Sequence, residues 1–165
     1  MRRIVCDTGP ILHLHEAAVL KVLEKLGQVC VPPAVRAELS RKRSRWDIQG
    51  DWIQMESLQG GPQSEALDWQ RAGLLDPGEA QAIALAKQVG ADWFLTDDAA
   101  ARLVAEQQGL EVHGSLGVVL GAAALGHLDR LAAQNALNGL FSSTLWLSAR
   151  VQEQAKAALR KLFPE

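Results

Sequence analysis

Five acidic side chains stand at positions that could form a metal-dependent hydrolytic site. Asp7 and the pair Asp97-Asp98 each follow a short apolar segment with strand character. Glu38 lies within an expected helix, and Glu79 lies in the first turn of another. Ligands of open parallel sheets bind beyond the carboxyl ends of the strands, so these acids should converge at one edge. Clustered carboxylates repel one another unless cations neutralise them, and such oxygen ligands suit Mg²⁺ or Mn²⁺.

Each acid also has a purely structural explanation. Asp7 and Asp98 could cap the helices that follow them. Glu79 completes a capping box with Asp76, and Glu38 taken alone would be a surface charge. Their joint placement is what favours a functional site over five separate structural roles.

The acids need an alternation of strands and helices to bring them together. Short apolar or β-branched segments predict strands, with the third at an edge of the sheet. The expected strands are 4–6, 29–31, 52–55, 93–96 and 110–112. Apolar periodicity, proline starts and glycine stops predict the helices between them. The first of these helices ends near Gly27, and the second begins at Pro32-Pro33. The others cover 65–72, 76–90, 99–108 and 115–125, with Ser115 as the cap of the last one. This order predicts an α/β fold with a parallel sheet covered by helices on both faces.

The C-terminal segment 126–165 is expected to be a helical extension of one domain spanning 1–165. It holds a helical piece at 128–137, a cap cluster at 142–144 and a helix with apolar residues spaced by four. We expect this last helix to pack on its own domain. A dimer or partner-protein surface is the alternative.

The bulk composition excludes several classes of protein. The chain has 165 residues, 48% hydrophobic content and a formal net charge of -2, so a globally basic nucleic-acid binder is excluded. Contact with a nucleic acid must come from a local patch or through metal ions. Cys6 and Cys30 have no zinc-ligand spacing and are expected to be buried thiols. An early acid and short apolar runs argue against a signal peptide or membrane helix, so a soluble cytoplasmic protein is expected.

Two basic features could contact a phosphate backbone. The run 41–45 follows Glu38 closely, although a solvated loop explains it equally well. Arg102 lies one helical turn after Asp98 and could pair with a site acid or touch phosphate, but a simple salt bridge is the favoured role. None of the four histidines has ligand-like spacing.

These motifs together resemble the PIN-domain family, and within it the VapC-like branch catalogued as DUF3368. The resemblance covers almost the whole chain. The segments that carry it are 5–10, 31–35 with Glu38-Leu39, 78–84, 95–98 with Ala101-Arg102, and 114–120.

The resemblance implies a three-layer α/β/α fold with about five parallel strands and Mg²⁺- or Mn²⁺-dependent ribonuclease activity. VapC-like members are usually toxins that a small antitoxin holds inactive. The family's first two acids carry over to Asp7 and Glu38, and the supporting hydroxyl to Thr8. The third acid, commonly Asp, falls on Glu79, which is a departure.

The fourth acid of the family has two candidates. The Thr-x-Asp pattern selects Asp98, whereas the position at the strand end favours Asp97. We therefore predict metal binding by Asp7, Glu79, Asp97 and Asp98, with Glu38 able to orient or deprotonate the attacking water. Thr8, Thr96, Arg102 and Ser115 are predicted to support the site or touch the substrate.

Two other functions are weaker alternatives. A non-catalytic PIN-like module that binds RNA or protein is consistent with glutamate at position 79. A phosphotransfer protein of the receiver or haloacid-phosphatase type also places acids at strand ends. Asp7-Thr8-Gly9 lacks the second aspartate of the phosphatase pattern, and no suitable lysine follows a late strand.

Overall fold

The computed structural model describes residues 1–42 and 52–165 and contains a five-stranded parallel sheet in the order β3-β2-β1-β4-β5. The strands are β1 Arg3–Cys6, β2 Gln28–Val31, β3 Ile53–Met55, β4 Trp93–Leu95 and β5 Val112–His113. All four strand pairs are parallel. The predicted fold class is confirmed, including the edge position of β3.

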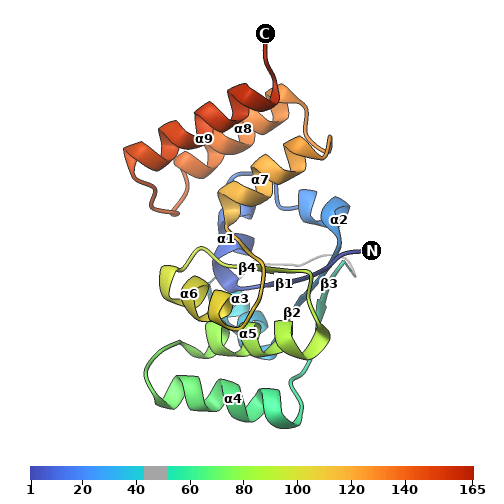
Figure 1. The fold of residues 1–165 in the computed structure, drawn as a ribbon, viewed down its shortest axis with the longest axis vertical. Helices are drawn as coiled ribbons and strands as arrows, with labels where there is room; N and C mark the ends of the chain where they lie inside the picture. Colours follow the sequence, from blue (N-terminus) through green and yellow to red (C-terminus); the bar gives the residue numbers. More distant parts are fainter. Residues whose placement is uncertain (43–51) are drawn as a thin grey trace.

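Helices cover both faces of the sheet (Figure 1). They are α1 Thr8–Glu16, α2 Val22–Leu26, α3 Pro33–Lys42, α4 Gly60–Arg71, α5 Pro77–Val89, α6 Ala99–Gln107, α7 Ser115–Ala124, α8 Arg130–Phe141 and α9 Ala149–Leu162. α4 and α5 lie on one side of the sheet, and α2 and α7 lie on the other, with α8 and α9 beyond α7. α5 packs directly on β1 and β4, and α3 packs against both α5 and α1.

The central strands are apolar because both of their faces are covered. Ile4 and Val5 of β1 and Phe94 and Leu95 of β4 are completely buried, as expected for the middle of a parallel sheet between two helical layers. Cys6 is also buried, and burial raises its thiol pKa well above the ordinary value. The two cysteines are free and buried, as predicted.

The first helical segment is shorter than predicted. α1 ends at Glu16, and Ala18 adopts a left-handed backbone with φ 57° before α2 begins. A left-handed residue stops an α-helix, so the single helix expected here is divided into two, while its predicted end near Gly27 is confirmed by the end of α2. α8 approaches this turn so closely that a Cβ on Gly139 would lie 2.9 Å from the Ala17 Cα.

Other helix and strand boundaries also differ from the predicted ones. α4 begins five residues earlier than expected, and β5 begins two residues later, at Val112. The cap of α9 is Ser148, which accepts a hydrogen bond from the Val151 amide, rather than the predicted 142–144 cluster. Arg41 and Lys42 of the predicted basic run end α3, and the rest of that run lies outside the described residues.

The C-terminal helices join the rest of the chain through α1 and α7. α8 packs on both of these helices, and α9 packs on α7 and α8. Within the described residues, no helix is long and apolar enough to cross a membrane.

Candidate active site

Two adjacent central strands deliver Asp7 and Thr96 to the same point. β1 and β4 are paired with Cys6 opposite Leu95, and the Asp7 amide donates to the Leu95 carbonyl at 2.9 Å. The Thr96 hydroxyl donates to Oδ2 of Asp7 at 3.0 Å, and the Thr8 amide donates to Oδ1 at 2.8 Å. Asp7 is 6% exposed and Thr96 2%. Parallel pairing therefore fixes a buried carboxylate at the carboxyl edge of the sheet.

Glu38 reaches this site from α3. The Thr8 hydroxyl donates to Oε2 of Glu38 at 2.5 Å, so Thr8 holds one of the predicted site acids in place. The Glu38 carboxylate also lies against the start of α5, because a Cβ built on Gly78 would stand 2.5 Å from Oε1. A side chain at position 78 would occupy the space that the carboxylate fills.

The start of α5 supplies two more acids. Asp76 and Glu79 form the predicted capping box: the Glu79 amide donates to Asp76 Oδ1 at 2.8 Å, and the Asp76 amide donates to Glu79 Oε2 at 3.1 Å. The structural role considered for Glu79 is thus confirmed. It does not remove Glu79 from the site, because the box holds both carboxylates beside Asp7.

The electrostatics show how close these acids are to one another. Burial raises the pKa of Asp7 from 3.8 to about 6, repulsion from Asp76 and Glu38 adds to this, and the hydrogen bonds from Thr8 and Thr96 oppose it. Burial likewise raises the pKa of Glu79 to about 7, with repulsion from Asp76, Asp98 and Asp7.

Five acids therefore form one acidic cluster, defined as Asp7, Glu38, Asp76, Glu79 and Asp98. Within residues 1–42 and 52–165, no lysine or arginine forms an ion pair with any of them. The cluster carries a negative charge that the described side chains leave unneutralised.

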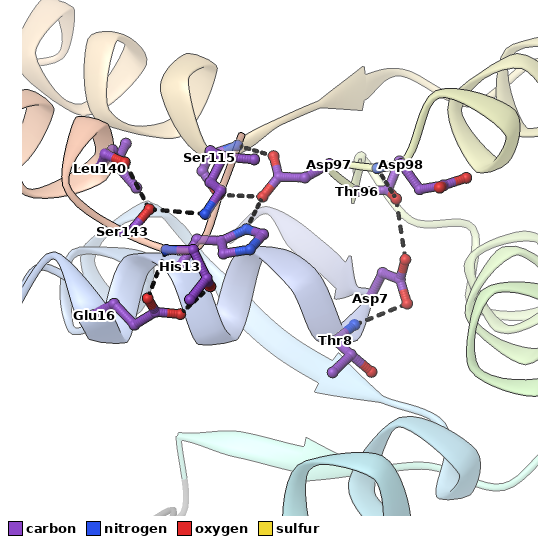
Figure 2. A network of polar contacts seen from close by, with 12 residues as sticks. Asp7, Thr8, His13, Glu16, Thr96, Asp97, Asp98, Ser115, Leu140 and Ser143 are labelled. Carbon is purple, nitrogen blue, oxygen red and sulfur yellow. Dashed lines mark hydrogen bonds and ion pairs between the residues drawn. The ribbon is translucent and has the colours of Figure 1, made fainter. Parts of the chain in front are cut away.

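The two adjacent aspartates after β4 have different surroundings (Figure 2). Asp97 accepts from the Ser115 amide at 2.7 Å and the Ser115 hydroxyl at 2.6 Å, and His13 Nδ1 lies 2.7 Å from its Oδ2. Asp98 points the other way, caps α6 through the Ala101 amide at 2.8 Å and raises the pKa of Glu79. The structure brings Asp98 into the acidic cluster and places Asp97 in a separate network that ties β4 to α1 and α7.

The family model for DUF3368, described as a PIN domain, matches residues 3–161. The chain belongs to this family. PIN domains are generally nucleases and typically use divalent metals. A search of curated proteins finds no match.

Two residues of this PIN domain were missed as members of its polar networks. Asp76 was recognised only as a helix cap, although two acids three residues apart in a capping box necessarily lie together. His13 was not singled out because no histidine has ligand-like spacing, and its contact with Asp97 joins residues 84 positions apart. In the sequence, Gly9 and His13 are four residues apart and therefore lie on the same face of the helix. In the structure, this face of α1 lies toward Asp97.

Ser115 does not act as first expected, whereas Arg102 has the role favoured from the sequence. Gly114, rather than Ser115, is the cap residue of α7, and both polar groups of Ser115 are used on Asp97. Arg102 donates to the Val112 carbonyl at 3.1 Å and pairs with Glu106 at 3.7 Å. The simple salt bridge favoured for Arg102 is confirmed, and none of its described partners is a site acid.

The donor set of this PIN domain fits a hard divalent cation. The acidic cluster offers carboxylate oxygens, and no lysine or arginine of the described residues pairs with them. In the described part of the chain, no group of three or more carboxylate, imidazole or thiol side chains has an arrangement that could hold a metal ion. The fit is therefore one of donor chemistry and charge.

Proposed function

We propose that this PIN domain is a Mg²⁺- or Mn²⁺-dependent endoribonuclease. The observation that carries the proposal is Asp7, a buried carboxylate at a strand end whose pKa is raised to about 6 by burial and by neighbouring acids. Keeping several carboxylates together without a cationic partner destabilises a fold, so such a cluster is expected to serve a ligand that supplies positive charge.

The residues divide into metal ligands and supporting groups. We infer that Asp7, Glu79 and Asp98 hold the cations and that Glu38, fixed by Thr8, orients or deprotonates the attacking water. Thr96 positions Asp7 and also accepts a hydrogen bond from the Asp98 amide at 3.2 Å. When bound, the cations would supply positive charge to the phosphate and lower the pKa of the attacking water.

We further propose that the protein is the toxin of a VapBC-like toxin-antitoxin pair. The support is the family relationship, together with the resemblance of the sequence to the VapC-like branch. A small antitoxin would then hold the nuclease inactive. Expression of the wild-type chain should arrest growth, and a small gene beside it should encode the protein that restores growth.

A cleavage assay on pooled cellular RNA tests the nuclease proposal. The wild-type chain should cut RNA with Mg²⁺ or Mn²⁺ and stop when EDTA is added, and Asp7→Asn should lower the rate by more than about 100-fold. Asp68→Asn is the matched control, because Asp68 is an exposed acid on α4 and is not among the groups that shift the pKa of Asp7 or Glu79. Undiminished cleavage by Asp7→Asn would contradict the proposal.

A non-catalytic binding module is the second candidate. The observation that favours it is the capping box, which already uses Oε2 of Glu79. Retention of RNA or a protein partner by the wild-type chain, with no cleavage in any divalent cation, would select this alternative.

A further inference from the structure

Trp146 stands out from the loop between α8 and α9. It is 83% exposed, whereas its neighbours Leu145 and Leu147 are partly buried. This alternation turns the two leucines toward the protein and the indole toward solvent. An exposed tryptophan leaves a large apolar ring in water, which favours a ligand for that ring.

The loop that carries Trp146 is anchored on both sides. The Thr144 amide and hydroxyl donate to the two carboxylate oxygens of Glu16 at 2.8 and 2.6 Å, at the end of α1. The Leu147 carbonyl accepts from Gln152 at 3.2 Å. The indole is therefore presented by a fixed loop, which lowers the entropy that a ligand must offset on binding.

One cavity is lined both by this tryptophan and by Asp98 of the acidic cluster. It has a volume of about 480 Å³ and is lined by Thr96 and Asp98 of the site, by Arg102, and by Trp146. This volume is within the range of about 300–1,000 Å³ that holds small organic groups. Figure 2 shows the same helix, α1, joining the site at Asp7 to the loop at Glu16.

Arg102 gives this cavity a positive group in addition to its acidic and aromatic lining residues. Its side chain is 44% exposed. In the described residues, the contacts with Val112 and Glu106 occupy at most two of the five N–H donors of a guanidinium. The remaining donors suit a phosphate oxygen.

We propose that this cavity binds one nucleotide of single-stranded RNA next to the scissile phosphate, with its base stacked on Trp146 and its phosphate held by Arg102. The inference rests on the proposed nuclease function, because Asp98, one of the acids assigned to it, lines the cavity. An aromatic face and a cation in one cavity that also includes Asp98 match the way proteins bind unpaired nucleotides. Stacking on one ring tolerates every base, so the subsite adds affinity for unpaired RNA without reading its sequence.

The test measures RNA binding separately from cleavage. The probe is a labelled pool of random single-stranded octaribonucleotides, titrated into the full chain carrying Asp7→Asn so that the probe stays intact. Adding Trp146→Leu should weaken binding by about 10-fold or more, because leucine keeps apolar surface but cannot stack. Trp146→Phe should restore most of the affinity. Leu131→Ala is the control, since Leu131 is 66% exposed on α8 and does not line the cavity.

The outcomes separate this inference from the nuclease proposal. Trp146-dependent binding with no cleavage by the wild-type chain would uphold the subsite and reject the nuclease. If the wild-type chain cleaves RNA but the Asp7→Asn chain binds the probe equally well with and without Trp146→Leu, the subsite alone is overturned. Unchanged RNA binding, with loss of a co-purified protein in Trp146→Leu, would overturn it and assign the surface to protein docking. No probe binding by the Asp7→Asn chain would overturn it as well.

Discussion

At the scale of single residues, the neighbouring aspartates Asp97 and Asp98 have different roles. Asp98 belongs to the acidic cluster and caps α6, whereas Asp97 receives two hydrogen bonds from Ser115 and a contact from His13. Ser115 is completely buried, so its polar groups depend on Asp97. Charge chemistry and structural anchoring are thus divided between adjacent positions.

Isosteric substitutions should separate these two roles. Asp98→Asn should lower RNA cleavage by more than about 100-fold while changing the free energy of unfolding by less than about 0.5 kcal/mol, because asparagine caps helices as well as aspartate does. Asp97→Asn should retain cleavage but lose about 1–2 kcal/mol of stability, since charge-assisted hydrogen bonds become neutral ones. Urea unfolding and a cleavage assay on the same samples measure both. The reverse assignment would follow if Asp97→Asn were inactive and fully stable.

The raised pKa of Asp7 predicts a dependence of stability on pH. Burial and neighbouring acids raise it from 3.8 to about 6. A carboxyl with a higher pKa in the folded state stabilises the fold below about pH 4, and this contribution is lost as the pH rises through about 6. In EDTA, the free energy of unfolding should therefore fall relative to Asp7→Asn between about pH 4 and 7, by up to about 3 kcal/mol.

Urea unfolding of both chains over this pH range gives the measurement. The comparison with Asp7→Asn removes the contributions of carboxyls that both chains share, and Mn²⁺ at pH 7 should restore the lost stability of the wild type. If the difference in the free energy of unfolding between the wild type and Asp7→Asn stays constant from pH 4 to 7, the raised pKa of Asp7 is contradicted.

At the scale of elements, the site depends on how closely α3 meets the start of α5. The Glu38 carboxylate occupies the space above Gly78, and the Thr8 hydroxyl from α1 holds it there. Three helices thus fix one side chain, and glycine at position 78 is what allows it.

Gly78→Ala should lower activity without lowering stability. The added Cβ would stand 2.5 Å from a Glu38 oxygen at the end of a flexible side chain, so the carboxylate moves and the fold persists. Cleavage should fall by about 10-fold or more because Glu38 leaves its position, while α5 gains up to about 1 kcal/mol of helix stability. Gly121→Ala in α7 meets open space and should give a similar stability gain with unchanged cleavage. Equal cleavage by the two variants would contradict the role of Glu38.

The sequence predicted the elements whose signals are local. The capping box at Asp76 and the cap at Asp98 were predicted because a few consecutive residues determine them. The break at Ala18 was not, because alanine disfavours a left-handed backbone and the turn is packed against Gly139, more than a hundred positions away. The choice between Asp97 and Asp98 depends on His13 and Ser115, which only the folded chain brings near.

At the scale of the whole molecule, α1 links the acidic cluster, the Asp97 network and the loop that carries Trp146. Its N-terminus follows Asp7, its middle contacts Asp97 through His13, and its last residue anchors the loop that presents Trp146. The acidic cluster and the cavity beside it lie where these parts meet. The arrangement depends on the helical C-terminal segment as well as on the sheet.

Direct Mn²⁺ binding tests the central claim, that the acidic cluster is a cation site. Isothermal titration at about pH 7.5 should show one or two Mn²⁺ ions bound per wild-type chain, the same affinity for Asp68→Asn, and a loss of at least about 10-fold for Asp7→Asn. Binding that is absent from the wild type at millimolar Mn²⁺, or equally tight in Asp7→Asn, would contradict the account.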